Sequence, residues 1–142
     1  MSFPDRDTRR DYLAALLTAE GSWQIVYNHQ PTSFQGQSPV ATVHSGPVEW
    51  ENLTAARALQ VVRMTLLVTN YMKRDDAEDA EDQLDALLAT VVGLVNDNAR
   101  VASIWNDLRI TGTEPDYYLV DGEQYRAEVI RVEATVYEKK GT

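Results

Sequence analysis

The sequence predicts an α+β two-layer sandwich, in which a mostly antiparallel sheet of about five strands carries two helices on one face. Apolar and polar residues alternate from Ile130 to Val136, which is typical of a strand with one buried face. Asp121-Gly122 stands between two segments with strand character and favours a turn. Aliphatic residues recur at the spacing of one helix face at Leu84, Leu87, Leu88, Val91, Val92 and Val95. A helix laid on a sheet with a polar far face is therefore expected.

The first helix is expected from Asp5 to Glu20. Its apolar stripe consists of Leu13, Leu16 and Leu17, and Gly21 favours a helix end directly after it. Early aspartates suit the positive end of the helix dipole. The chain is therefore expected to begin with a short amphipathic helix.

Two short strands are expected next, from Trp23 to Tyr27 and from Val40 to His44. Between them, Asn28 to Ser38 consists mainly of Gln, Ser, Pro and Gly around a single Phe34, which predicts a mobile loop. Residues 48–58 fit neither periodicity well, and we expect irregular extended chain there.

A long half-buried strand is expected from Leu59 to Met72, where alternate residues are apolar. After the second helix, a strand is expected from Ile104 to Thr111, with Trp105 on the face opposite its other apolar residues. A turn region from Gly112 to Gly122 and a last strand from Gln124 to Tyr137 complete the order α-β-β-β-α-β-β.

The second helix is expected from Glu78 to Val95, with Asp75 or Asp76 as its N-cap. Gly93 lies inside it, where glycine costs about 1 kcal/mol relative to alanine. We therefore expect either close packing of Gly93 against a strand or a local bend.

Length and composition predict one globular domain spanning residues 1–142, since 44% of the 142 residues are hydrophobic and 25% are charged. The chain has no cysteine, which excludes disulfides, thiolate catalysis and cysteine-ligated zinc. No secretion signal or membrane span is expected. Residues 74–142 hold seven Lys/Arg and sixteen Asp/Glu, whereas residues 1–73 hold six of each, so the net charge of −9 belongs to the second half. An acidic surface of this kind disfavours ordinary nucleic-acid binding.

The two histidines, His29 and His44, could be imagined with Glu49 as a metal site or an acid–base pair. Such a site needs a third convergent ligand or an oriented nucleophile, and no spacing supplies one. Scattered surface histidines are the simpler interpretation. The glycines form neither a phosphate loop nor a dinucleotide fingerprint, so no cofactor is expected.

An acidic run precedes and opens the second helix, and carboxylates can bind divalent cations. Its spacing lacks the turn glycine and distal glutamate of a calcium loop. Carboxylates in a first helical turn are stabilised by the helix dipole. We interpret the run as a helix start with a solvated face, or as a charged surface facing a partner or a channel; its members are Asp75, Asp76, Glu78, Asp79, Glu81 and Asp82.

Two aromatic residues are expected to be exposed, Phe34 in the polar loop and Trp50 between two glutamates. Either could also fold back onto the domain. No group of residues indicates catalysis, and binding or assembly is the expected class of function.

The layout resembles the tail terminator, or tail completion, proteins of long-tailed bacteriophages and related tail-like particles. The resemblance covers nearly the whole chain. It rests on the leading helix Asp5 to Glu20, the polar loop Asn28 to Ser38, the long strand ending at Met72 and the helix Glu78 to Val95. It continues in the run Tyr125-Arg-Ala-Glu-Val-Ile-Arg-Val-Glu-Ala-Thr-Val, which is similar to the last strand of that family.

The resemblance implies a structural protein without catalytic activity, in the virion tail at its head-proximal end and in the host cytoplasm during assembly. It implies a homohexameric ring that caps the tail tube, ends tube polymerisation and forms the surface to which the head attaches. The implied partners are further copies of the chain, the tail tube protein, a head-completion or connector protein, and double-stranded DNA that passes through without specific binding. An acidic lumen would suit the passage of DNA, so the acidic run is a candidate for the lumen wall or for a solvated face. The candidate residues for contact with the tail tube or a neighbouring copy are His29, Gln30, Phe34, Gln35, Gln37 and Trp50.

Two other functions remain open from the sequence. One is another head-tail connector or tail component of similar architecture. The other is a small intracellular ligand-binding or enzyme domain, which a deep pocket with convergent polar groups would favour.

Overall fold

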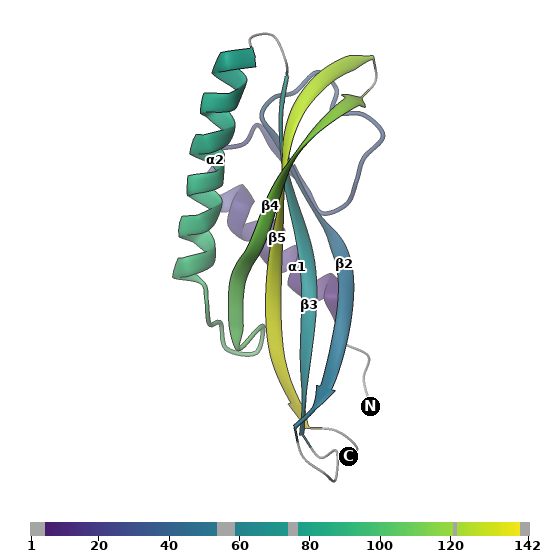
Figure 1. The fold of residues 1–142 in the computed structure, drawn as a ribbon, viewed down its shortest axis with the longest axis vertical. Coiled ribbons are helices and arrows are strands. Elements are labelled where there is room, and N and C mark those ends of the chain that lie inside the picture. Colours follow the sequence, from purple (N-terminus) through teal and green to yellow (C-terminus); the bar gives the residue numbers. More distant parts are fainter. Residues whose placement is uncertain (1–4, 54–58, 74–76, 121, 140–142) are drawn as a thin grey trace.

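A computed structural model describes residues 5–53, 59–73, 77–120 and 122–139, and it confirms the α+β fold. Five strands form one sheet in the order β1-β2-β3-β5-β4, in which β1 pairs with β2 in parallel and all other neighbours are antiparallel. Both helices contribute to one hydrophobic core and lie on the same side of the sheet (Figure 1). The order of elements along the chain is the predicted α-β-β-β-α-β-β.

Helix α1 spans Arg6–Glu20, as its apolar stripe predicts. Its N-cap is Asp5, whose Oδ1 accepts a hydrogen bond from the backbone N–H of Thr8 at 3.0 Å. Gly21 ends it in the left-handed conformation, with φ 86°, and donates its N–H to the carbonyl of Leu17.

Strand β1 is short, Ile25–Tyr27, but β2 runs from Val40–Asn52 and is much longer than predicted. The register of β2 against β3 shifts between Ser45 and Val48, so the Ser45-Gly46-Pro47 segment is a bulge and does not end the strand. The prediction of irregular chain over residues 48–58 is therefore wrong for residues 48–52, which belong to β2. Residues 54–58 lie outside the described residues.

Strand β3 (Leu59–Lys73) lies at the centre of the sheet and pairs along its whole length with β5 (Glu123–Lys139). Alternate residues of both strands are buried under the helices, as the period-2 pattern predicts. These core residues are Val62, Met64, Leu66, Val68, Ile130, Val132, Ala134 and Val136.

Helix α2 spans Ala77–Asp97 and packs four of its six predicted stripe residues into the core. Leu88 is half-buried, whereas Val92 is 38% exposed and lies outside the stripe. Gly93 is exposed, and a Cβ added to it would meet no atom within 4 Å, so close packing against a strand is not the reason for this glycine. The predicted N-cap residues lie outside the described residues.

Strand β4 spans Asp107–Val120. The prediction of a turn region from Gly112 to Gly122 is therefore wrong for residues 112–120, which belong to the strand. A register shift between Ile110 and Gly112 marks a bulge, and Pro115 is accommodated because β4 is an edge strand. Trp105 lies before the strand and is 2% exposed in the main core, which corrects its expected placement on the opposite face.

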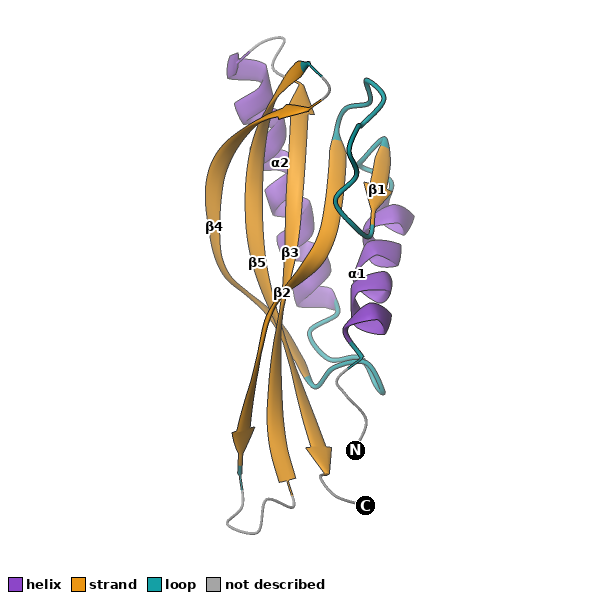
Figure 2. Ribbon diagram, turned by 90° about the vertical axis from the view of Figure 1, so that its right-hand side faces the viewer, coloured by secondary structure: helices purple, strands orange, loops and turns teal. Residues whose placement is uncertain are grey.

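The far face of the sheet is not uniformly polar, because a second apolar cluster covers its upper end. Phe34 from the loop between β1 and β2 packs there against Tyr71 and Tyr125, with ring centroids 4.7 and 5.1 Å away. Phe34 is 1% exposed, so its expected exposure is wrong. The loop is irregular, as predicted, and lies beside β1 and β2 (Figure 2). The packing of Phe34 fixes it to the sheet.

Candidate functional site

An open cavity lies where the helical layer ends and the sheet continues. Strands β2, β3 and β5 extend beyond the helices (Figures 1 and 2). The segment after α2, helix α1 and the end of β5 border this cavity, which has a volume of about 650 Å³. We call it the ledge cavity; its lining includes Arg9, Arg100, Ser103, Trp105, Tyr137 and Glu138.

The ledge cavity combines an apolar floor with two arginines. The Trp105 ring is buried and donates its Nε1–H to the carbonyl of Asn98 at 2.7 Å, which fixes the floor. Arg9 donates from Nε to the carbonyl of Ile104 at 2.7 Å, which holds its guanidinium at the cavity wall. Arg100 is exposed, and within the described part of the chain neither arginine forms an ion pair. The cavity therefore suits a ligand that carries a carboxylate.

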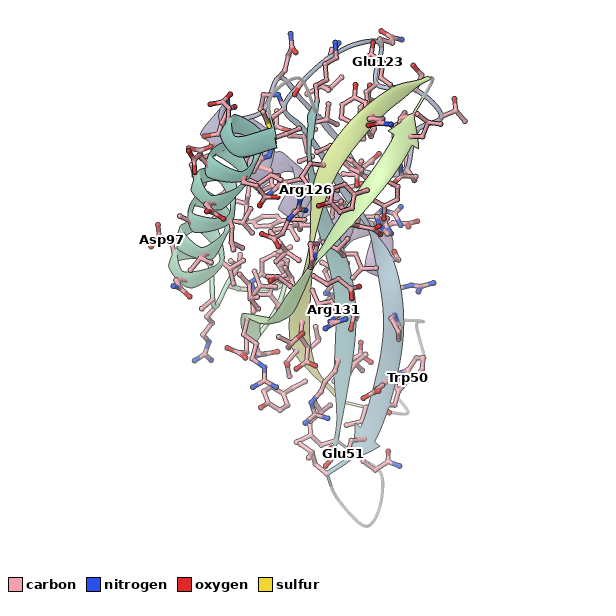
Figure 3. All side chains as sticks on the ribbon, turned by 45° about the horizontal axis from the view of Figure 1, so that its top comes forward. Trp50, Glu51, Asp97, Glu123, Arg126 and Arg131 are labelled. Atoms are coloured by element: carbon pink, nitrogen blue, oxygen red, sulfur yellow. The ribbon has the colours of Figure 1, made fainter. Side chains whose placement is uncertain are left out.

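The acidic run of the sequence lies partly on the outer side of α2. Asp79 and Asp82 are exposed, and Asp79 accepts a hydrogen bond from Gln83 at 2.7 Å. Glu81 is different, because it pairs with Arg126 of β5 at 2.5 Å and connects α2 to the β4–β5 hairpin. Figure 3 shows Arg126 between the helix and the hairpin. Asp75 and Asp76 lie outside the described residues, and Glu78 lies in the first turn of the helix.

The β4–β5 hairpin presents large apolar side chains near its tip. Tyr117 is 60% exposed and Leu119 is 71% exposed, although sequence patterns placed both in a turn region. The Arg126 guanidinium lies 5.1 Å from the centroid of the Tyr117 ring. Exposed apolar side chains at one end of a molecule are typical of a contact surface.

The backbone of the β4 edge is partly blocked against pairing with another strand. Pro115 has no N–H to donate. The N–H of Tyr117 donates to Oδ1 of its neighbour Asp116 at 2.7 Å. Two successive features of this kind disfavour strand addition at this point of the edge.

The six predicted contact residues are not brought together into one patch. In the loop, His29, Gln30 and Gln35 are exposed and Gln37 is half-buried, but Phe34 is buried beneath them. Gln30 accepts a hydrogen bond from the Tyr71 hydroxyl at 3.0 Å, so part of its polar group serves the fold.

Trp50 lies apart from the loop, near the end of β2. It is 45% exposed, as predicted, and Figure 3 shows it on the part of the sheet that extends toward Glu51. Its register partner on β3 is Val62, which places it on the helix side of the extended sheet.

The two histidines occupy different environments. The His29 ring packs edge-on against Tyr27 and is exposed, whereas His44 is half-buried on β2, where burial lowers its pKa. Within the described residues, no three or more His, Asp and Glu side chains gather as a metal site would require. Neither helix there contains an apolar stretch long enough to cross a bilayer.

No protein-family model matches the chain, and a comparison with curated proteins found no match.

The residues that form the ledge cavity were not identified from sequence patterns. Arg9 and Arg100 lie in different segments, and only the tertiary fold brings them to one cavity. For the hairpin tip, a signal was present, because Tyr117-Tyr118-Leu119-Val120 is a continuous apolar run.

Proposed function

We propose that this chain is a tail terminator of a phage or a phage-like tail particle. In this proposal six copies form a ring on the end of the tail tube, end its polymerisation and present the surface to which the head attaches. The chain catalyses no reaction and needs no cofactor. It acts in the virion tail, after assembly in the host cytoplasm.

The observation that carries the proposal is the layout of the fold. The order α-β-β-β-α-β-β, two helices on one face and an irregular loop between the first two strands are the features on which the resemblance rests. A fold alone does not determine function, so the proposal depends on surfaces as well.

Exposed apolar side chains at both ends of the long sheet support a role in assembly. Tyr117 and Leu119 lie near the hairpin tip, while Trp50 and Tyr137 lie toward the opposite end of the sheet. A subunit with unlike contact surfaces at its two ends can associate head-to-tail, and such contacts close into a ring when the rotation allows it.

The acidic surface supports passage of DNA through such a ring. Repulsion between carboxylates and phosphates keeps a duplex from binding to the wall. In the proposed ring, those exposed carboxylates of α2 that do not contact a neighbouring copy face the passage.

Electron microscopy of the purified chain, alone and mixed with the tail tube protein of the same particle, tests the proposal. We expect six-membered rings, and shorter tubes with a ring at one end. Tubes that elongate to the same length with and without the chain, and that carry no density at their ends, would contradict it.

The ledge cavity favours one alternative function, that of a small ligand-binding domain. Its volume lies within the range of small-molecule sites, but it is only partly enclosed. Native mass spectrometry of the chain from cell extract would favour this alternative by detecting one stoichiometric bound compound.

A further inference from the structure

Among the described residues, the two arginines of the ledge cavity form no ion pair, although the protein has an excess of carboxylates. The chain has 22 acidic and 13 basic residues, so most cations have a carboxylate available. Arg126, Arg63, Arg109, Arg10 and Lys73 each form an ion pair, whereas four arginines form none within the described residues: Arg6, Arg9, Arg100 and Arg131. Arg9 and Arg100 differ from the other two in their position. Both line the same cavity.

Arg9 is held ready to receive an anion. Its Nε and Nη1 donate to the carbonyls of Ile104 and Asp5, at 2.7 and 3.1 Å, and carbonyls do not neutralise the charge. Hydrogen bonds from Thr8, and to a lesser degree the charge of Arg9, lower the pKa of the exposed Asp5 carboxyl group, but Asp5 and Arg9 form no ion pair within the described residues. Arg100 adds a second positive charge to the same cavity, and among the described residues that line it the one carboxylate is that of Glu138. Glu138 accepts a hydrogen bond from Gln60 and so lies toward β3.

The same chain carries a surface of the opposite charge at the other end of α2. Asp82 and Asp85 are exposed and stand one helical turn apart, and neither forms an ion pair within the described residues. The neighbouring Glu81 is already engaged by Arg126. Two carboxylates at this spacing can approach two guanidinium groups together.

We propose that the ledge cavity of one copy receives the acidic first turns of α2 from a second copy, with Asp82 and Asp85 facing Arg9 and Arg100. The contact joins two unlike surfaces of the same chain and is therefore heterologous. In such a pair, α2 of the first copy and the ledge cavity of the second copy stay free, so that further copies can add head-to-tail. The inference rests on the proposed ring and names the contact that builds it.

Disulfide trapping tests the contact directly, because the chain has no cysteine of its own. Asp82→Cys and Ser103→Cys variants are prepared separately, one with a tag, and mixed under mild oxidation. We expect a mixed disulfide dimer well in excess of either homodimer. Ser103 lines the cavity, and the matched control replaces Asp82→Cys by Glu114→Cys, an exposed position on β4. Equal cross-linking in the control mixture would overturn the proposal.

Charge exchange provides the second measurement. Arg100→Glu and Asp82→Arg are each expected to weaken self-association by about tenfold or more, because like charges then face one another. The double variant is expected to recover most of the loss, whereas the control variants Arg131→Glu and Glu114→Arg are expected to change association little.

The outcomes separate this contact from the proposed function. If the Arg100→Glu variant forms the same rings as the wild type and no selective cross-linking is seen, the contact is overturned and the tail terminator proposal stands. Selective cross-linking without rings, alone or on tubes, would support the contact and contradict the ring. A chain that stays monomeric and gives no selective disulfide would overturn the contact.

Discussion

Arg126 and Glu81 form a two-point ion pair that fastens helix α2 to the β4–β5 hairpin. Nε lies 2.5 Å from Oε1, and Nη2 lies 3.2 Å from Oε2. The Arg126 side chain is only 12% exposed, while that of Glu81 is 48% exposed. A bidentate pair with one largely buried partner is stronger than an ordinary surface pair.

The first prediction concerns this pair. Glu81→Gln is expected to lower the free energy of unfolding by about 1 kcal/mol, because solvent at the glutamate screens part of the attraction. Thermal unfolding at low and at 1 M salt measures it, and the difference from wild type should shrink at high salt. Glu133→Gln is the matched control, since its partner Arg109 is 63% exposed and the effect should be smaller. An equal loss in both variants would contradict the assignment.

Phe34→Ala is predicted to destabilise the fold, in contrast to the expectation from sequence that Phe34 is an exposed contact residue. Its ring is buried among Tyr71, Tyr125 and Tyr27, and truncation of a buried phenylalanine costs about 3–5 kcal/mol. Equilibrium denaturation in urea measures the loss. Trp50→Ala, at a 45% exposed site, should lose much less, and a Phe34→Ala protein as stable as wild type would refute the buried role.

The parts of the fold that the sequence predicts well are those where one periodicity runs without interruption. Helix α1 and strands β3 and β5 have clear stripes or alternation, and their buried faces follow directly. Where the prediction fails, an apparent turn residue lies inside a strand. Gly46-Pro47 lies in a bulge of β2, and Pro115 lies in the edge strand β4. Both positions tolerate these residues because fewer hydrogen bonds to a neighbouring strand are required there.

The candidate sites were less predictable, because they depend on contacts between distant segments. Loop composition correctly indicates irregular structure, but only the fold shows that Phe34 meets Tyr71 and Tyr125. In the same way, the local sequences around Arg9 and Arg100 give no sign of a shared cavity. Charge patterning does identify the acidic start of α2, although not that Glu81 is already paired.

Gly93→Ala is predicted to stabilise the isolated subunit. The glycine is exposed in the interior of α2, and an added Cβ meets no atom within 4 Å. Alanine should therefore raise the free energy of unfolding by about 1 kcal/mol through its helix propensity. Thermal unfolding should show a rise of roughly 2–4 °C. Gly46→Ala is the contrasting variant, since its Cβ would lie 3.1 Å from the carbonyl oxygen of Thr65 and should destabilise. A loss of stability in Gly93→Ala would indicate that the helix is not open at this point.

The last prediction concerns pH and the carboxyl group of Glu128, a half-buried residue of β5. Burial raises its pKa above the ordinary value, Arg126 opposes the shift, and the nearby carboxylates Asp85 and Glu81 reinforce it. The folded protein therefore binds this proton more tightly than the unfolded chain does. The resulting stabilisation is complete below the unfolded pKa, near 4.5, and is lost as pH rises through the folded pKa. Glu128→Gln removes this loss, so the variant should be more stable than wild type at pH 7 and differ less at pH 4. Thermal unfolding of both proteins across this range measures the difference, and a wild type that gains stability over the variant as pH rises would reverse the sign and contradict the prediction.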